Sequence, residues 1–334
     1  MGNRALRVIQ CGKETVFGTP VAATAVFGGL TDATVHPMVT VAQRRYLQGH
    51  YAPAHAAVVT DVRGKAVLTG DFTCEDFPIV GNCSLKGGVT GSVIDTSGYT
   101  YAFPFPLTAA PALEFRTWEF TDQVQEYQMA SGLVESFVLT GGNGIDAVVG
   151  LQVNLIGPKI AKGTLTAALS SRAQTVMPCT NMKLYIDALG GTIGTTIKAD
   201  TLINWTYTYT TGLHMKKFQA GGTNPTAWGC GVPSAKLQMT AEFNSVAVAE
   251  VDAMLAGTGR LVKIIGENGL AGASTAKYTL DAQIAGDITD VSDLWSDRDG
   301  NTIADFTVSA RYDRGAFANW GKINVINKVV TLPG

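Results

Sequence analysis

The side chains that proteins most often use to bind metal ions are few in this sequence and widely separated. Its four histidines form neither an H-E-x-x-H nor an H-x-x-x-H pair: His36, His50, His55 and His214. His50 and His55 flank a Tyr-Ala-Pro-Ala segment, which is typical of a surface loop. The sequence therefore gives no support for a histidine-based metal site.

Cysteine chemistry is not indicated either. The five cysteines are odd in number and scattered along the chain: Cys11, Cys74, Cys83, Cys179 and Cys230. None forms a C-x-x-C pair, which is the spacing of zinc ribbons and thioredoxin-like sites. We expect buried free thiols in a reducing cytoplasm.

Two polar segments match ligand-binding loops only in part. Residues 87–92 begin with two glycines but lack the Gly-Lys-Ser/Thr ending of a phosphate loop. Asp297, Asp299 and Asn301 have the ligand spacing of a calcium loop, but glycine stands at the fourth position and Val308 replaces the closing glutamate. We expect a plain turn at the first segment and a solvated hairpin turn at the second.

A carbohydrate-binding or hydrolysing β-protein is an alternative from a different class. It would need paired carboxylates framed by exposed aromatic rings. The candidate carboxylates lie near Trp118 in sequence: Glu114, Glu119 and Glu126. Residues around them alternate as in a strand, and no partner motif accompanies them. The sequence therefore favours a protein that is not an enzyme and has no cofactor.

The composition favours many short strands over helices. The chain has 334 residues, of which 46% are hydrophobic and only 16% charged, and it contains 38 glycines. A large apolar fraction with few charges indicates that copies of the chain cover much of its exterior. The net charge of −2 provides no basic field to hold nucleic acid, so a conduit for DNA is favoured over a clamp.

No segment has the features of a signal peptide or of a membrane helix. The N-terminal residues lack an apolar stretch followed by a cleavage site. No run approaches the roughly eighteen apolar residues that a spanning helix needs. We expect a protein made in the cytoplasm, with no membrane partner.

Alternation with a period of two residues predicts strands along most of the chain. Residues 133–140 and 145–156 flank a Gly-Gly-Asn-Gly turn and are predicted to form a hairpin. Residues 202–210 alternate aromatic residues with threonine, which favours a core or subunit-interface strand over a surface that stacks bases or sugars. Residues 277–287 and 303–312 are predicted to form another strand pair. An acidic loop is expected between them, with four aspartates: Asp290, Asp293, Asp297 and Asp299.

Two helices interrupt this pattern. The first is short, near residues 75–83, and Pro78 limits its length. The second is predicted after Asn244-Ser245, where apolar residues follow helical spacing, and it ends at Gly257.

Three short segments recur later in the chain in the same order, which indicates an internal repeat. Residues 15–19 are answered by 192–195, residues 68–72 by 239–243, and residues 142–145 by 300–303. We therefore expect two copies of one β-rich domain, at residues 1–160 and 165–334. The joining segment is not low in complexity, so a compact pair is expected.

Several segments carry a resemblance to a known family. Residues 12–20, Gly-Lys-Glu-Thr-Val-Phe-Gly-Thr-Pro, place an acidic residue before an aromatic-Gly-Thr-Pro. Further segments are the strand-like residues 64–73, the aromatic and proline-rich residues 99–106, and residues 130–137. In pattern and order they resemble the major tail tube proteins of long-tailed bacteriophages (siphophages), over nearly the whole chain.

The resemblance implies a structural virion protein of the phage tail, made in the host cytoplasm, that forms stacked rings around the channel for DNA ejection. Each tail tube domain would be a β-sandwich or small barrel with a short flanking helix, and would contribute hairpins to an inter-subunit luminal β-barrel. A doubled chain implies a trimeric ring with pseudo-sixfold symmetry, with a hexamer as the alternative. The implied partners are further copies of the chain and the tape measure, tail terminator and distal tail proteins. DNA would pass through the lumen without sequence-specific binding.

Two regions are expected to make contacts between subunits or rings. The first is the N-terminal arm, because Pro20 favours an extended path for Thr19 and an exposed aromatic ring precedes it. The second is the acidic loop at residues 289–301. The expected contact residues are Phe17, Gly18, Thr19, Pro20, Asp290, Asp293, Asp297 and Asp299. A capsid-associated or decoration β-protein, which would not polymerise, is the main alternative reading.

Overall fold

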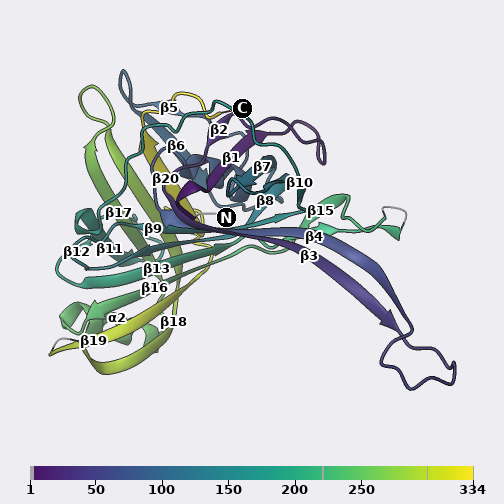
Figure 1. Cartoon of the computed structure of the whole chain (residues 1–334). Coiled ribbons are helices and arrows are strands. Elements are labelled where there is room, and N and C mark those ends of the chain that lie inside the picture. The colour runs from purple at the N-terminus through teal and green to yellow at the C-terminus, as the bar shows by residue number, and fades with distance from the viewer. Residues whose placement is uncertain (1–3, 220–221, 299, 334) are drawn as a thin grey trace.

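Strands dominate the computed structural model, which describes residues 4–219, 222–298 and 300–333 (Figure 1). Strands account for 51% of the structure and helices for 8%, so the expected mainly-β class is confirmed. Neighbouring strands pair in the antiparallel sense, and the main sheet is open.

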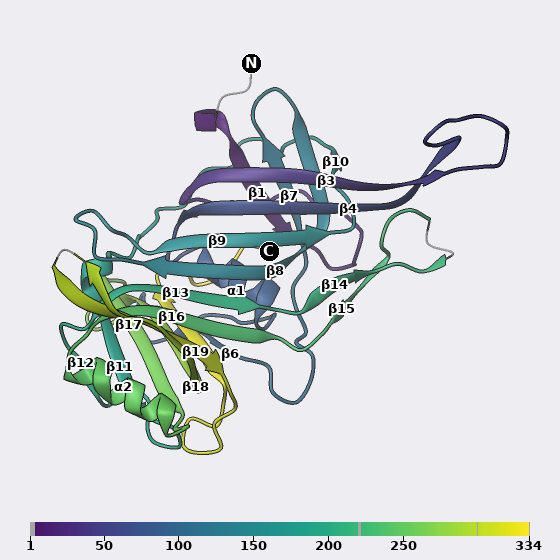
Figure 2. The same cartoon turned by 90° about the horizontal axis from the view of Figure 1, so that it is seen from below.

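Eight long strands form one continuous sheet across the molecule (Figure 2). In spatial order they are β3 (Leu30–Arg44), β4 (Ala56–Asp71), β9 (Gly150–Gly157), β8 (Glu126–Gly141), β13 (Leu202–Thr210), β16 (Ser234–Glu242), β19 (Asn301–Ala310) and β18 (Lys277–Arg298). One face of this sheet is apolar because alternate residues point to the same side. Leu68, Phe137 and Val153 are fully buried there.

A second layer packs against the apolar face. Its strands in the first half of the chain are β1 (Val8–Lys13), β2 (Ala25–Val26), β7 (Arg116–Thr121) and β10 (Ala161–Lys162). In the second half they are β11 (Met182–Ala188), β12 (Ile197–Lys198), β17 (Arg260–Leu270) and β20 (Gly321–Asn327), extended by β6 (Tyr99–Pro104) and β5 (Ser92–Val93). The N-terminal parts of β8 and β18 pair with β7 and β17, so these two long strands belong to both layers.

The two α-helices are placed differently. α1 (Phe77–Ser84) is mostly apolar, and every one of its residues is buried, including the polar Asn82 and Ser84. α2 (Ser245–Leu255) is capped by Asn244, whose side chain accepts hydrogen bonds from the amides of Val246 and Ala247. Both helices lie where the sequence predicts them. Short 3-10 turns occur at Arg4–Leu6 and Cys179–Asn181.

Two hairpins project from the same end of the eight-stranded sheet (Figures 1 and 2). One is the outer part of β3 and β4, which ends in the loop at residues 45–55. The other is β14 (Leu213–Lys216) with β15 (Ala227–Cys230), which continues from β13 and returns to β16.

The strand pairing of the first half is repeated in the second. The first half has the order β1–β7–β8–β9–β4–β3, and the second has β11–β17–β18–β19–β16–β13. Corresponding strands follow one another in the same chain order, and α1 follows β4 as α2 follows β16. We call β3, β4, β9 and β8 the first block and β13, β16, β19 and β18 the second block.

Two of the irregularities in the ladders occur at corresponding positions in both halves, whereas others, such as the shift between Ser292 and Ser296, do not repeat. The ladder of β3 skips one residue between Leu30 and Asp32, and that of β13 skips one between Leu202 and Asn204. The ladders of β8 and β18 skip one residue after Val134 and after Ile288. Bulges have no reason to coincide in unrelated sheets, so they fix which residues of the two blocks correspond.

The three recurring sequence segments occupy corresponding places. Residues 15–19 and 192–195 form turns after β1 and β11, with Gly18 and Gly194 at φ +82° and +85°. Residues 68–72 and 239–243 end β4 and β16, and residues 142–145 and 300–303 follow β8 and β18.

The two halves are interlocked more closely than two consecutive domains would be. Residues 161–178 stay with the first half: Thr166 donates to Glu119, Arg172 pairs with Asp76, and Val176 bridges to Thr73. The expected start of a second copy at residue 165 therefore falls inside a segment that packs on the first half. In addition, β20 near the C-terminus pairs with β6 on one side and β18 on the other.

Candidate assembly interface

The outer face of the eight-stranded sheet is polar and mostly uncharged. On its five central strands the outward positions are rich in hydroxyl and amide side chains: Ser136, Thr140, Gln152, Asn154, Asn204, Thr206, Thr208, Thr210, Gln238, Thr240, Thr307 and Ser309. Several bond across strands, as Asn154 does to Ser136 at 2.8 Å and Thr240 to Asp305 at 2.6 Å. Such a face can be hydrated without binding an anion tightly.

Two basic side chains on this face lie beside carboxylates, and a third, Lys236 on β16, is exposed opposite Thr208. Lys65 Nζ lies 3.0 Å from Glu135 Oε2, and Arg63 Nε lies 2.7 Å from Asp61 Oδ2. Acidic side chains also occur without an adjacent lysine or arginine on the same ladder, such as Asp290 opposite Thr307. The face therefore offers little net positive charge to a polyanion.

The two ends of the eight-stranded sheet are edges. Within the described residues, β3 pairs only with β4, and β18 beyond Gly286 pairs only with β19. Unpaired strand edges present rows of amides and carbonyls that can bind another strand. On β3, the Ala33 carbonyl accepts a hydrogen bond from Arg7 Nη1 at 3.0 Å, so the carbonyl of this residue points outward from the edge.

The expected N-terminal arm packs on its own chain. The Phe17 ring is half-buried and meets Phe115 edge to face, with centroids 5.7 Å apart. The Gly18 amide donates to Ser131 Oγ at 2.6 Å, and residues 17–18 form a turn. The interpretation of Phe17 as an exposed ring is wrong, because the sequence could not reveal the distant Phe115. Thr19 and Pro20 are exposed, and the role of the four residues in assembly stays a prediction.

The prediction of an acidic loop at residues 289–301 is wrong. β18 continues to Arg298 and β19 begins at Asn301, so the segment is a long hairpin. Asp290 is exposed and pairs with Thr307, and Asp297 pairs with Thr302 and accepts a hydrogen bond from the Gly300 amide. Asp293 lies within β18, and Asp299 falls outside the described residues. Cross-strand pairing overrides the turn preference of aspartate and glycine here.

Trp118 and the carboxylates near it in sequence serve the fold. Trp118 is fully buried and cannot stack on a sugar from solvent. Glu119 accepts from the Thr166 amide at 2.8 Å, and Glu126 accepts from the Leu165 amide at 2.9 Å. Burial raises the pKa of Glu114, but Lys13 and Arg116 lower it by more, so the net pKa falls. Tyr207 and Tyr209 are buried, as expected for a core strand.

The described cysteines and histidines are not arranged as a metal-binding or catalytic site. Cys11, Cys74 and Cys83 are buried and Cys179 and Cys230 half-buried, all as free thiols. Burial raises the pKa of the Cys83 thiol to about 12, which makes it unreactive at neutral pH. Among the described residues no three histidine, cysteine or acidic side chains are grouped as metal ligands. Neither helix in the described part of the chain is long and apolar enough to cross a membrane.

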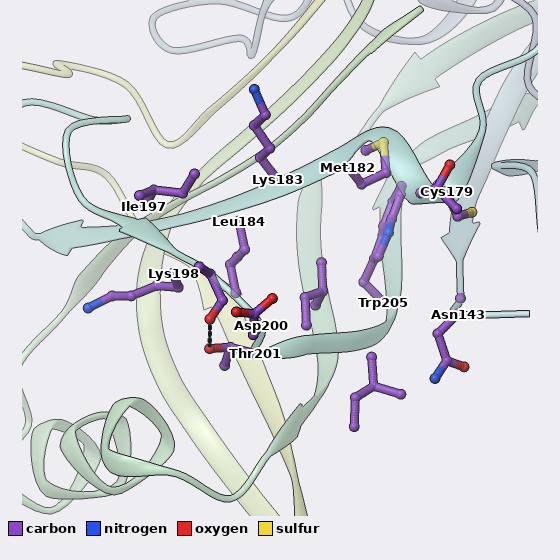
Figure 3. Close-up of a pocket in the computed structure, with 15 residues that line it drawn as sticks. Asn143, Cys179, Met182, Lys183, Leu184, Ile197, Lys198, Asp200, Thr201 and Trp205 are labelled. Atoms are coloured by element: carbon purple, nitrogen blue, oxygen red, sulfur yellow. Dashed lines mark hydrogen bonds between the residues drawn. The ribbon is translucent and has the colours of Figure 1, made fainter.

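One cavity lies where the two blocks meet (Figure 3). It has a volume of about 420 Å³ and lies between the β8–β9 loop and the starts of β11 and β13. Asn143 and Trp205 line one side, and Asp200 and Thr201 another, where Thr201 Oγ1 donates to the Ala199 carbonyl at 2.9 Å. Burial raises the pKa of the lining Cys179 thiol, so this thiol is a poor nucleophile.

Sequence reasoning missed two features of this candidate interface, the edge strand β3 and the projecting loop at residues 45–55. Val35, Val39 and Val41 alternate with polar residues and could have indicated a strand. Comparison with known proteins adds nothing to this description, since no family model and no curated protein matches the chain.

Proposed function

We propose that this chain is the major tail tube subunit of a long-tailed bacteriophage, which assembles into stacked rings around a channel for DNA ejection. One observation carries the proposal: an open eight-stranded sheet made of two blocks with the same strand order, joined edge to edge, whose two end strands have no further partner among the described residues. Each half of the chain would then be a tail-tube-type domain.

Copies that add through these edges extend the same sheet until it closes as an inter-subunit luminal β-barrel. Closure removes both edges, which would otherwise remain open to unwanted pairing. Two blocks per chain give six blocks in a trimer, and hence pseudo-sixfold symmetry. A hexamer is the alternative stoichiometry.

The uncharged polar face suits a surface that lines a DNA channel. Binding to DNA becomes strong and salt-dependent when lysine and arginine neutralise phosphates. Lys65 and Arg63 already have carboxylate partners, and the central strands carry mainly threonine, asparagine and glutamine. DNA could pass such a face without being held by it.

The projecting hairpins suit stacking of one ring on the next. Both leave the same end of the sheet, and Leu47 and Tyr51 at the tip of the longer one are fully exposed. A contact between one end of a ring and the other end of its neighbour does not close, so it propagates as a tube. The tape measure, tail terminator and distal tail proteins would be the partners in the virion.

Electron microscopy of the purified full-length chain tests the proposal. We expect rings or tubes with a central channel in negative stain. A Val39→Lys variant places a charge on the free edge, at a side chain that is 53% exposed, and should abolish them while leaving the circular dichroism spectrum unchanged. The matched control is Val93→Lys on β5 in the second layer, at a side chain that is 68% exposed, and it should assemble normally.

Two outcomes would overturn the proposal. One is a wild-type chain that stays monomeric at every concentration and salt condition tested. The other is a chain that binds a capsid surface as a closed oligomer and never polymerises, which is the behaviour of a decoration protein.

A further inference from the structure

The contact between β8 and β13 joins the two blocks within one chain, and it has a precise register. Ser136 pairs with Thr210, Phe137 with Tyr209, and Val138 with Thr208. We propose that this contact is the pattern for the contact between copies: the outer part of β18 in one copy pairs with β3 of a second copy in the corresponding register. The inference rests on the proposed function and deepens it by naming the partner strands.

The bulges fix the correspondence on the β18 side. Ser136 pairs with Asn154 two positions after Val134, across a skipped residue. Asp290 pairs with Thr307 two positions after Ile288, across a skipped residue. Asp290 therefore corresponds to Ser136, and Ser292 corresponds to Val138.

The same reasoning fixes the β3 side. Leu202 and Leu30 stand at the same bulge, each before a skipped residue. Counting along both strands from this bulge makes Met38 correspond to Thr210, and His36 to Thr208. If the contact between copies has the register of the internal contact, Asp290 of one copy lies opposite Met38 of the next, and Ser292 lies opposite His36.

Residues of β3 are more exposed than the corresponding residues of β13, as expected for a strand that lacks a neighbour in the position of β8. Tyr209 is fully buried and Thr211 is 2% exposed, because β8 lies beside them. The corresponding residues of β3 are Pro37, which is exposed, and Val39, which is 53% exposed. A strand in the position of β8 would cover both.

The directions of the backbone hydrogen-bonding groups of β13 and β3 agree with this correspondence. Thr211 donates its amide to the Glu135 carbonyl at 3.0 Å, so odd-numbered residues of β13 face β8. The outward Ala33 carbonyl shows that odd-numbered residues of β3 face the free edge in the same way. Pro37 has no amide hydrogen, so this ladder has one donor fewer than the internal one, which also makes the edge a poor match for arbitrary strands.

A second, smaller cavity completes the correspondence. It has a volume of about 230 Å³ and is formed by the starts of β1 and β3, as the 420 Å³ cavity is formed by the starts of β11 and β13. The larger cavity has a wall from Gly142 and Asn143 after β8, which the smaller cavity lacks. Gly300 and Asn301, the recurring pair after β18, would provide that wall from the second copy.

Disulfide trapping tests the register in the full-length chain. Asp290→Cys combined with Met38→Cys forms a non-hydrogen-bonded pair, for which the Cα atoms of antiparallel strands lie roughly 4.5 Å apart, within the range for a disulfide. The mismatched control is Asp290→Cys with Thr34→Cys, on the same face but four residues out of register, or roughly 13 Å. Ser292→Cys with His36→Cys is a second matched pair, in case the first variant fails to fold.

Copper phenanthroline serves as the oxidant, and covalent oligomers are counted on non-reducing gels. Wild type gives the background from the five native cysteines. We expect at least a tenfold excess of covalent oligomers for the matched pairs over the mismatched pair. Equal yields, or an excess for the mismatched pair, would overturn the register.

The outcome separates this inference from the proposed function. Tubes that form normally but give no matched crosslink would refute the register alone. Matched covalent rings that never stack into tubes would support the register while refuting the tail tube proposal.

Discussion

Tyr209 and Tyr207 lie on the same face of β13, and their hydroxyl groups have opposite surroundings. Tyr207 is fully buried and donates from its hydroxyl to the Gln283 carbonyl at 3.2 Å. Tyr209 is equally buried, but within the described residues its hydroxyl has no hydrogen-bond partner. Its ring packs in a cluster that includes Phe105, Phe137 and Trp320, at centroid distances of 4.7, 5.4 and 6.0 Å.

Replacing each tyrosine by phenylalanine should therefore act in opposite directions. Tyr209→Phe keeps the ring contacts and removes a desolvated hydroxyl, which should raise the free energy of unfolding by about 1 kcal/mol. Tyr207→Phe loses a hydrogen bond and should lower it by about 1 kcal/mol. The two variants should differ by roughly 2 kcal/mol, or about a factor of 30 in the unfolding equilibrium.

Urea unfolding followed by circular dichroism measures this difference. Burial raises the pKa of both phenols, so both stay protonated at neutral pH. Each variant should be unfolded at two protein concentrations, because assembly would add a concentration-dependent stabilisation. Equal denaturant slopes would show that the free energies can be compared. Finding Tyr209→Phe as destabilised as Tyr207→Phe would refute the assignment of an unsatisfied hydroxyl.

Two further predictions concern other parts of the chain. Phe17→Ala should destabilise the monomer by about 1–2 kcal/mol in the same assay, because a half-buried ring loses its contact with Phe115. Val16→Ala is the control and should have no effect, because the Val16 side chain is 60% exposed. Asp95 accepts hydrogen bonds from the backbone amides of Ala276, Thr275, Ser274 and Gly98, and these bonds lower the pKa of its carboxyl group. The ionised carboxylate therefore stabilises the folded state above the unfolded pKa of about 3.9, and this stabilisation is lost as the pH falls through the lower folded pKa. Asp95→Asn should unfold at lower urea than wild type at pH 7, and a gap that failed to narrow between about pH 5 and pH 2 would contradict this reasoning.

Local signals in the sequence were sufficient for elements that neighbours in sequence determine. Asn244 caps α2 through its own side chain, and β8 and β9 form the predicted hairpin, although β9 begins at Gly150 and not at residue 145. Alternation correctly predicted that Tyr207 and Tyr209 face the core. In each case the signal lies within a few residues or on one strand, even where the packing partners, such as Phe105 and Trp320 around Tyr209, are remote in sequence.

Features set by distant partners could not be predicted. The aspartates at 290 and 297 favour turns, yet both lie in strands because β19 pairs with them. Phe17 looked like an exposed ring because Phe115 is remote in sequence. The β3 edge is defined by the absence of a neighbour in the described chain, and no pattern within residues 30–44 can encode that.

The two junctions of the proposed ring differ in the side chains that they bury. At the internal junction Trp205, Tyr207 and Tyr209 pack into the core, and a buried aromatic side chain covers 150–250 Å². The corresponding residues of β3 are Ala33, Val35 and Pro37, which are small and pack against fewer partners. The internal junction would therefore be stable in the isolated chain, which has to fold before it assembles. The junction between copies would depend on backbone pairing and on repetition around the ring, because each closed ring makes every such contact at once. If the chain polymerises as proposed, two aromatic junctions would risk indiscriminate association in solution, whereas one strong and one weak junction would limit association outside the growing tube.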